Sequence, residues 1–323
     1  GQDGPYIKNI YTKQTIRRKL GQLYTTFEIL YHNVTMYIKE TTVSTNNPPI
    51  TKAPSKQNIN SKFKTSLSRN LSMWVGISEA IRLFSTNKPH DYKFYQWLAG
   101  LIDGNGCFQL SKKGYASLEI VMETRDKHCL YQIKQKFGGS IKVKSDVNWL
   151  RYRLHDRQGL TRLINSINGL IRNPNRLLQL AKLCEKYEIK LLPTENLIWD
   201  SAWLSGFFDS DGSIYFNLES HQVFITACQK NKFILDDLVK LYGGNIYVMV
   251  KQGAFKWTVF RKDDILKLKE YFNLNKSRSA KQKRINLLDK YYDLRKHKAH
   301  ILGSNVILNK EWNKFLKDWE NYK

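Results

Sequence analysis

Acidic side chains at two matching places in the sequence could bind a metal ion and hydrolyse a phosphodiester. The segment WLAGLIDGNGCF at 97–108 contains Asp103, and the segment WLSGFFDSDGSIYF at 203–216 contains Asp209 and Asp211. Carboxylate oxygens suit Mg²⁺, and hydrolysis of a phosphodiester uses such an ion to activate water and stabilise the leaving oxygen. This chemistry requires a fold that brings the two segments together.

An internal repeat supplies the elements that must position these segments. Each segment opens with an aromatic and apolar run, and a pair of glycines follows it about 30 residues later. The matching stretches are Gly138-Gly139 and Gly243-Gly244, then 151–163 and 256–268, then 173–180 and 278–285. A single offset of about 105 residues accounts for every pairing, so chance is a poor explanation.

Each copy is predicted to form a helix, two strands, a helix, two strands and a helix. In the first copy we expect the opening helix to end near Asp103, and the Gly138-Gly139 pair to end the second helix in a left-handed conformation. The expected strands lie at about 107–112, 115–122, 140–145 and 149–155, and the expected later helices at about 126–137 and from 157. The fold class is therefore α+β, with two antiparallel sheets in halves related by pseudo-two-fold symmetry.

The composition indicates a polyanionic partner. The 323 residues carry 53 Lys and Arg against 28 Asp and Glu, a formal net charge of +25. Such an excess is typical of proteins that bind nucleic acid or, less often, an anionic membrane surface. No apolar run approaches the length of a membrane span, so none is expected. The 4 cysteines form no C-x-x-C pair, which argues against a zinc ribbon.

Three segments are expected along the chain. They are a basic extension at 1–90 with a helix, a polar linker and a second helix, a first half at 91–192, and a second half at 193–323 with a C-terminal helical tail. The Arg-rich opening could belong to a targeting segment. In the tail, Trp312, Phe315 and Trp319 form one apolar stripe, which we expect to pack on the second half.

The repeated segments resemble the two signature helices of the LAGLIDADG family, whose members are homing endonucleases and group I intron maturases. LAGLIDGNG at 98–106 and LSGFFDSDG at 204–212 carry the resemblance, which extends over about 91–300. It implies a saddle of two antiparallel sheets built from two αββαββα halves. Small residues allow two helix backbones to approach closely where the halves meet. The predicted junction residues are Ala99, Gly100, Ser205 and Gly206.

The first copy departs from the family pattern. In the family, the eighth motif position supplies one metal-binding acid per half, and this position is Asp211 in the second copy but Asn105 in the first. An amide can offer one oxygen to Mg²⁺ but lacks the charge, so we expect DNA cleavage to be severely weakened or lost. The family also places a Lys after the fourth strand. The repeat puts Lys281 there in the second half and Arg176 in the first, and Arg is a poor proton shuttle.

The resemblance therefore implies a Mg²⁺ centre with a degenerate first half. The predicted catalytic residues are Asp211, Asn105, Lys281 and Arg176, and the predicted metal ligands are Asp211 and Asn105. The sixth motif position, Asp103 and Asp209 here, is mostly structural in the family.

Alternation along the strands predicts which side chains face a nucleic acid. The residues expected to face the core are Phe108, Leu110, Leu118, Ile120, Ile141, Val143, Tyr152 and Leu154, and then Phe216, Leu218, Ile246, Val248, Trp257 and Val259. The residues expected to contact nucleic acid are Gln109, Ser111, Lys142, Lys144, Arg151, Arg153, Tyr215, Asn217, Tyr247, Lys251, Lys256 and Arg261. Side chains of these types read base edges and grip phosphates.

Two functional classes compete. The first is an RNA-splicing maturase that binds and stabilises the folded core of a group I intron without hydrolysis, and Asn105 and Arg176 favour it. The second is a Mg²⁺-dependent, site-specific DNA endonuclease or nickase, and a DNA-binding protein that does not cut is a third class. We expect a monomer that binds intron RNA or double-stranded DNA, with a host splicing factor as a further candidate partner. Abundant Asn, Lys, Ile and Tyr, together with the resemblance, favour the mitochondrial matrix.

Overall fold

The computed structural model describes residues 91–143, 148–301 and 305–321. The chain divides into two units, 1–80 and 81–323, and all described residues belong to the second. The expected extension at 1–90 and the predicted contact residue Lys144 therefore lie outside the described residues. None of the described helices has both the length and the apolar character that crossing a membrane requires.

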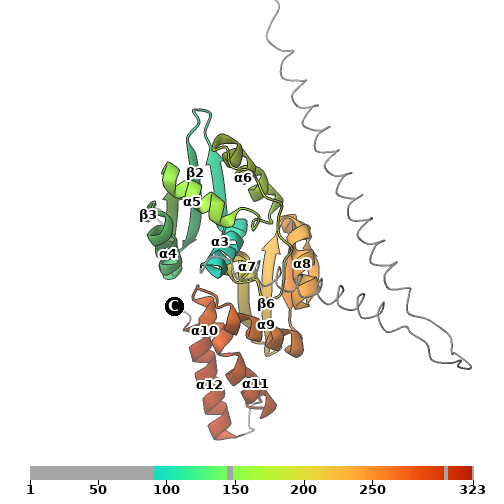
Figure 1. Ribbon diagram of the computed structural model, residues 1–323. Helices are drawn as coiled ribbons and strands as arrows, with labels where there is room; N and C mark the ends of the chain where they lie inside the picture. Colours follow the sequence, from blue (N-terminus) through green and yellow to red (C-terminus); the bar gives the residue numbers. More distant parts are fainter. Residues whose placement is uncertain (1–90, 144–147, 302–304, 322–323) are drawn as a thin grey trace, which may run out of the picture. The chain divides into compact units, whose positions relative to one another are not determined.

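The first copy of the repeat forms a four-stranded antiparallel sheet with helices packed on it (Figure 1). Its elements are α3 (Tyr92–Asn105), β1 (Gly106–Leu110), β2 (Ala116–Glu123), η1 (Thr124–Asp126), α4 (Lys127–Phe137), β3 (Ser140–Val143), β4 (Trp149–Leu154), α5 (Arg157–Ile167) and α6 (Pro174–Lys186). The strand order is β1-β2-β4-β3. Helices α4 and α5 pack on the sheet, and α6 packs against the edge strand β1.

The second copy repeats this arrangement and adds helices at its end. Its elements are α7 (Trp203–Asp211), β5 (Gly212–Asn217), β6 (Gln222–Gln229), α8 (Lys232–Tyr242), β7 (Asn245–Met249), η2 (Val250–Gln252), β8 (Ala254–Val259), α9 (Lys262–Leu274), α10 (Lys281–Asn286), α11 (Leu288–Lys296) and α12 (Val306–Glu320). The strand order β5-β6-β8-β7 matches that of the first sheet. The predicted α+β class with two equivalent antiparallel sheets is confirmed.

The glycine pairs end their helices at the predicted places and with positive φ. They do not adopt the predicted left-handed helical conformation, because ψ is −150° at Gly138 and −162° at Gly243. Gly138 and Gly139 have φ of 83° and 88°, and Gly243 and Gly244 have φ of 76° and 81°. A side chain at Gly139 would also lie 2.6 Å from the carbonyl oxygen of Arg153 on the neighbouring strand. Only glycine permits both the backbone conformation and the close approach, so each pair turns the chain from a helix into an edge strand.

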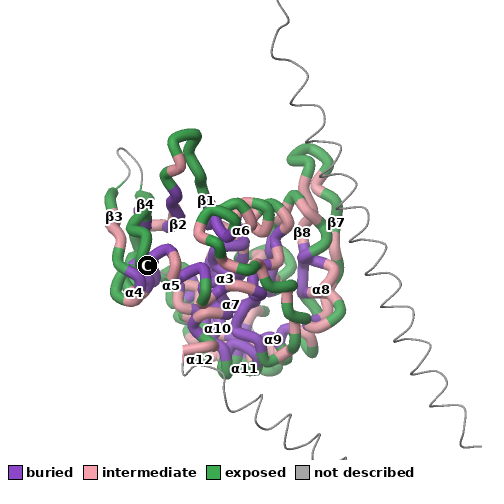
Figure 2. Tube along the Cα trace, turned by 45° about the horizontal axis from the view of Figure 1, so that its top comes forward, coloured by how far each residue is buried: buried purple, intermediate pink, exposed green. Residues whose placement is uncertain are grey.

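The strand alternation holds in the middle of the strands and fails at their ends. Most residues expected in the core are buried or partly buried, including Leu118, Ile120, Tyr152 and Trp257. The expectation was wrong for Leu110, Val143, Leu218 and Val248, which are 39%, 73%, 65% and 66% exposed. Figure 2 shows why: the strand ends extend beyond the buried helical layer, so no helix covers them. Leu218 also lies past the end of β5.

The C-terminal tail packs on the second half, as the apolar stripe predicts. Trp312, Phe315 and Trp319 of α12 are all buried. Their ring centroids lie 5.8, 6.0 and 6.2 Å from that of Phe216 at the end of β5. Tyr291 of α11 joins the same cluster, 6.0 Å from Phe216. The last two helices therefore extend the hydrophobic core of the second half.

Candidate metal centre and nucleic-acid interface

Helices α3 and α7 lie side by side at the junction of the two halves (Figures 1 and 2). A Cβ atom at Gly100 would lie 2.0 Å from the carbonyl oxygen of Trp203, and one at Gly206 would lie 1.7 Å from that of Trp97. These distances are far below van der Waals contact, so the two backbones touch where the glycines meet. The neighbouring residues Ala99 and Ser205 are also buried, but the Ser205 hydroxyl donates a hydrogen bond to the carbonyl oxygen of Lys276 (2.8 Å) in its own half.

The sixth-position acids hold the junction together and are closed to solvent. Each is bonded to the Trp indole of the other half and to backbone N–H groups of its own half. The donors to Asp103 are Trp203 Nε1 (2.8 Å), Arg172 N (2.8 Å) and Asn173 N (3.0 Å), and the donors to Asp209 are Trp97 Nε1 (2.8 Å), Arg278 N (2.8 Å) and Ser279 N (3.2 Å). Burial raises the pKa of Asp103 to about 7, although these hydrogen bonds oppose the shift. The carboxylates of Asp103 and Asp209 therefore have their hydrogen-bonding capacity used at the junction, so a metal ion would be bound by other groups.

Asp211 lies at the C-terminal end of α7, against the end of the first motif helix. A Cβ atom at Gly104 would lie only 3.1 Å from Cγ of Asp211, so the carboxylate reaches across to the residue beside Asn105. Gln229 donates a hydrogen bond from Nε2 to the carboxylate of Asp211. Burial raises the pKa of Asp211 to about 6, while Lys281, the Gln229 hydrogen bond and Arg176 pull the pKa down. Asp211 and Asn105 are both half-buried, so the centre opens to solvent.

The two predicted cations occupy corresponding places at the ends of the motif helices. Lys281 donates from Nζ to the carbonyl oxygens of Phe208 (2.8 Å) and Asp209 (2.9 Å). Arg176 donates from Nη2 to the carbonyl oxygen of Gly104 (3.4 Å), and its Nε is buried without a hydrogen-bond partner. Burial lowers the pKa of Lys281, and the surrounding carboxylates, Asp209 first, oppose that shift. Cations at helix C-termini are favourable, and both of these stay within electrostatic reach of Asp211.

Aligning the two copies of the repeat by sequence did not identify Gln229, whose side chain hydrogen-bonds to the carboxylate of Asp211. The strand registers define its counterpart in the first half: Ile225 pairs with Val259 as Leu118 pairs with Leu154, so Gln229 corresponds to Met122. Met122 is 2% exposed and offers no hydrogen bond donor. A fixed offset of about 105 residues instead pairs Gln229 with Thr124, and only the registers reveal the shift.

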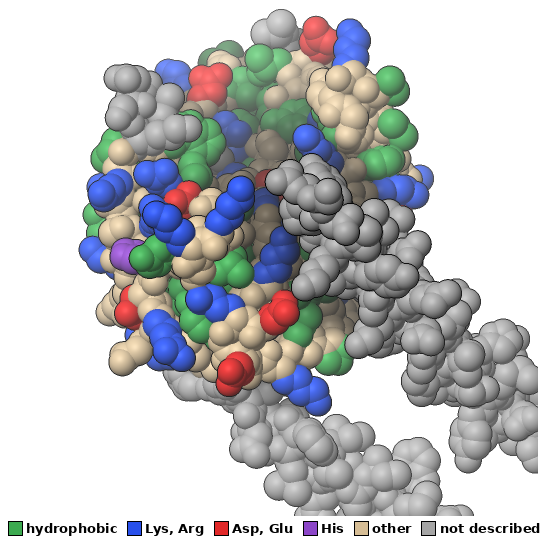
Figure 3. All heavy atoms as spheres, turned by 90° about the horizontal axis from the view of Figure 1, so that it is seen from above, with side chains coloured by type: hydrophobic (Ala, Val, Ile, Leu, Met, Phe, Trp, Pro, Cys, Tyr) green, Lys and Arg blue, Asp and Glu red, His purple; other side chains and the backbone are tan. Residues whose placement is uncertain are grey.

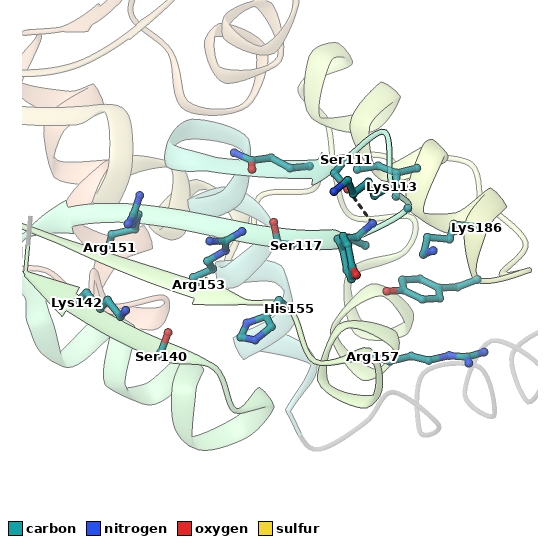
Figure 4. A pocket seen from close by; sticks show the side chains of 16 residues that line it. Ser111, Lys113, Ser117, Ser140, Lys142, Arg151, Arg153, His155, Arg157 and Lys186 are labelled. Carbon is teal, nitrogen blue, oxygen red and sulfur yellow. Dashed lines mark hydrogen bonds between the residues drawn. The ribbon is translucent and has the colours of Figure 1, made fainter.

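The first sheet carries most of its predicted contact residues on one open hollow of about 1130 Å³ (Figure 4). Gln109, Ser111, Lys142, Arg151 and Arg153 all line it. The hollow also contains cations that strand alternation did not predict, because they come from a turn and from helix ends: Lys113, Arg157 and Lys186. On the face of the molecule seen in Figure 3, Lys and Arg side chains likewise predominate over Asp and Glu.

The second sheet brings together only part of its predicted set. Tyr215 and Lys256 are in contact, with Lys256 Nζ 5.3 Å from the centre of the Tyr215 ring, and Tyr247 pairs with Lys256 in the strand register. Asn217 instead accepts hydrogen bonds from the backbone of Glu219 (2.9 Å) and Ser220 (3.0 Å), which fixes the turn after β5.

Two predicted contact residues of the second half lie outside the strands. Lys251 belongs to η2, the short helical turn between β7 and β8. Arg261 is the residue that precedes α9. Both side chains are exposed, and in sequence they flank the two ends of β8.

A comparison with known protein families matches both halves. The model described as "LAGLIDADG endonuclease" matches residues 98–187 and 204–292. The chain belongs to the LAGLIDADG family. These two matches contain both motif helices, both sheets and the residues at the junction.

Intron-encoded proteins of two kinds, maturases and endonucleases, are similar in sequence. The "Intron-encoded RNA maturase bI4" of Saccharomyces cerevisiae is 40% identical over 246 residues, covering 74% of this chain and 39% of that protein. The "Probable intron-encoded endonuclease aI2" of Debaryomyces hansenii is 38% identical, covering 70% of this chain and 37% of that protein. The "Intron-encoded DNA endonuclease ai2b" of Dictyostelium discoideum is 38% identical, covering 69% and 88%. The chain thus spans less than two fifths of the first two relatives.

Solved LAGLIDADG structures share the fold. Meganuclease I-SmaMI bound to uncleaveable DNA superposes with a TM-score of 0.54 at 19% identity, covering 70% of this chain and 98% of the other. LAGLIDADG meganuclease I-AabMI bound to uncleaved DNA gives a TM-score of 0.51 at 20% identity, also covering 70% and 98%. At these identities the likeness establishes the fold of the two halves.

The donor set of this LAGLIDADG centre suits one divalent ion. Asp211 supplies a carboxylate and Asn105 an amide oxygen, and among the described residues no group of three or more His, Cys, Asp or Glu side chains gathers to hold a metal. Mg²⁺ keeps several waters and is commonly held by one or two carboxylates plus substrate phosphates. The residues therefore fit a divalent ion whose remaining ligands would be water and phosphate.

Proposed function

We propose that this LAGLIDADG protein is an intron-encoded maturase that binds a group I intron RNA and stabilises its folded core. The observation that carries the proposal is the combination of a centre with one full carboxylate, Asp211, and a basic binding face that is otherwise intact. A protein that only binds RNA needs the basic binding face but does not need a catalytic acid in each half of the centre. The similarity to the maturase of Saccharomyces cerevisiae supports this choice.

Three substitutions of the first half support the loss of cutting chemistry. Asn105 stands where the second half has the metal-binding Asp211. Met122 stands where it has Gln229, whose amide hydrogen-bonds to Asp211, and Arg176 stands where it has Lys281. All three weaken the same half of the centre, while the buried contacts of the junction remain. This pattern is expected when selection maintains the scaffold and its binding face but no longer maintains cleavage of both DNA strands.

A nickase is the second candidate, because the other half of the centre is complete. Asp211 accepts a hydrogen bond from Gln229 and lies within electrostatic reach of Lys281. A single Mg²⁺ held by Asp211 with Asn105 would supply an activated water at one strand. The Dictyostelium discoideum relative that is described as a DNA endonuclease favours this alternative. We further propose that the protein acts as a monomer in the mitochondrial matrix, where intron RNA and a host splicing factor would be its partners.

A splicing assay separates these functions. Full-length protein is added to the precursor RNA of its host intron, and in parallel to a supercoiled plasmid that carries the ligated-exon sequence with Mg²⁺. A maturase accelerates splicing and leaves the plasmid supercoiled. Nicked circles without an effect on splicing would establish the nickase. Linear plasmid would show that both strands are cut, which would contradict the loss of cutting chemistry in the first half of the centre.

A further inference from the structure

The two sheets carry different chemistry at equivalent positions of their open faces. In the second half, Tyr215 pairs with Phe224, and the two rings are stacked with centroids 5.2 Å apart and planes 11° from parallel. Phe260, which follows β8, brings a third ring within 6.1 Å of Phe224. We name Tyr215, Phe224 and Phe260 the aromatic row. The buried Val223 and Ile225 alternate with Phe224, so the row lies on the face opposite the helices.

The same positions are polar in the first half. Gln109 pairs with Ser117 as Tyr215 pairs with Phe224, and His155 follows β4 as Phe260 follows β8. These three polar side chains line the basic hollow of the first sheet. The difference therefore affects a whole row across the sheet, at the same distance from the junction in each half.

Exposed rings on a sheet face need a flat, partly apolar ligand. Phe260 is 37% exposed and Tyr247, farther along the same face, is 49% exposed, while Tyr215 and Phe224 are half-buried. The open ring area would be covered favourably by another aromatic surface. The ammonium group of Lys256, 5.3 Å from the Tyr215 ring centre, places a positive charge beside the row. Aromatic rings next to a cation are suited to a nucleotide, which offers a base to the ring and a phosphate to the charge.

We propose that the aromatic row is a stacking platform for unpaired bases of RNA, an inference that rests on the proposed maturase function. Bases inside a duplex are stacked on their neighbours and present only their edges, which polar side chains read. The polar, cationic face of the first sheet suits a duplex segment, and the aromatic row suits bases splayed from a loop or junction. The two halves would then hold different parts of one folded RNA, a paired segment on the first sheet and an unpaired segment on the second.

The high positive charge of the chain makes a nucleic acid the expected occupant of the row. The chain carries a formal net charge of +25, and the exposed Lys251 and Arg261 flank the two ends of β8, the strand that carries Lys256. Phosphates of the stacked nucleotides and of a few neighbouring nucleotides could then form ion pairs with these cations. Stacking is tolerant of base identity, so the row would recognise unpaired character more than a particular sequence.

The first half offers matched substitutions for a test. Phe224→Ser and Tyr215→Gln install the side chains of the equivalent positions and remove the rings without changing the charge. Phe224→Tyr keeps a ring and is the conservative variant. Phe233→Ser is the matched control, because it removes a ring that is 61% exposed on α8, which packs on the helical side of the second sheet. Circular dichroism and thermal unfolding establish that each full-length variant is folded, and the Phe224→Tyr variant keeps the test valid if Phe224→Ser does not fold.

The probe is a short single-stranded RNA with 2-aminopurine at its centre, compared with the same RNA in a duplex. Stacking on a ring quenches 2-aminopurine, so we expect wild-type protein to quench the single strand. Phe224→Ser should lose this quenching and bind the single strand about 10-fold more weakly, while duplex binding changes less than about 2-fold. Phe224→Tyr and Phe233→Ser should behave as wild type.

Several outcomes would overturn the platform. These are wild-type binding of the single strand without quenching, equal losses for single strand and duplex in Phe224→Ser, or a loss confined to duplex DNA. The proposed function is judged separately by the splicing assay with wild-type protein. If wild type promotes splicing and Phe224→Ser retains full single-strand affinity, the platform is wrong and the maturase function stands. If wild type does not promote splicing, the function fails whatever the oligonucleotides show.

Discussion

At the residue scale, the centre depends on the charge that Asn105 lacks. Asp211 reaches across the junction to the residue beside Asn105, so a carboxylate at position 105 would face the same ion. Two facing carboxylates hold a divalent ion far more strongly than one carboxylate and an amide, because Mg²⁺ gains both charge and ligands. The shape of the site is nearly unchanged by Asn105, since an amide and a carboxylate have almost the same size.

We therefore predict that Asn105→Asp raises Mg²⁺-dependent nicking of a plasmid carrying the ligated-exon sequence. The rate should rise at least about 10-fold, because one further carboxylate adds a ligand for the ion that activates water. Single-turnover gel assays measure the rate, and Asn105→Gln, which adds no charge, is the control. An equal response of both variants would show that charge at this position is not what limits cutting.

The raised pKa of Asp211 makes stability depend on pH. Burial raises this pKa from 3.8 to about 6, so the folded protein binds a proton more tightly than the unfolded chain. The ionised carboxylate thus destabilises the fold above about pH 6, and this cost vanishes as the pH falls below about 4. Asp211→Asn should raise the free energy of unfolding at pH 8 by about 1–2 kcal/mol, less than the full shift because the group is partly exposed.

Urea unfolding between pH 4 and pH 8 measures this effect. The gain from Asp211→Asn should be largest at the alkaline end and absent near pH 4. Asp236→Asn is the control, because Asp236 pairs with Lys232 on the surface (3.3 Å) and should change the stability little at any pH. A gain that persists at pH 4 would contradict the assignment to burial of the charge.

At the element scale, the crossing of α3 and α7 is the contact on which the centre depends. The sequence predicted this contact from four small residues, and it also predicted the two sheets and the glycine pairs, because these patterns are local and repeated. The strand registers could not be predicted, since the two-residue shift of β6 relative to the fixed offset leaves the alternation intact. Gln229 and the exposure of Leu110 and Val143 follow from where strands end relative to the helices, which is a tertiary property.

Gly100→Ala should damage this crossing more than Gly104→Ala. The new methyl group at position 100 meets the backbone oxygen of Trp203 at 2.0 Å, and backbone in a packed helix cannot move aside. At position 104 the methyl group meets side-chain atoms of Ser210, the hydroxyl at 2.0 Å and Cβ at 2.6 Å. The hydroxyl can rotate away, and position 104 lies in the last turn of α3, where a small backbone shift relieves the contact with Cβ. We expect losses in unfolding free energy of about 3 kcal/mol or more at position 100 and about 1 kcal/mol at position 104.

Thermal and urea unfolding of the two variants measure the difference. Both substitutions lie in one helix and add one methyl group, so helix propensity cancels in the comparison. Similar losses at the two positions would mean that the helices can separate slightly without cost. In that case the tight crossing would not be what fixes Asp211 against the first motif.

At the scale of the whole molecule, binding to nucleic acid should be governed by counterion release. The hollow of the first sheet contains Arg151 and Arg153 on its floor, and each arginine that neutralises a phosphate releases condensed ions. The logarithm of the association constant for RNA should then fall linearly with the logarithm of the salt concentration. Arg151→Gln or Arg153→Gln should each lower the magnitude of this slope by about 1.

Filter binding of the host intron RNA across a range of KCl concentrations measures the slope. Lys240→Gln is the matched control, because Lys240 is 75% exposed on α8, which packs on the helical side of the second sheet. All three variants remove one positive charge, so a nonspecific effect of net charge would reduce the three slopes equally. We expect the two arginine variants to differ from wild type and Lys240→Gln to match it. An unchanged slope in the arginine variants would place the RNA on a surface other than the open sheet faces.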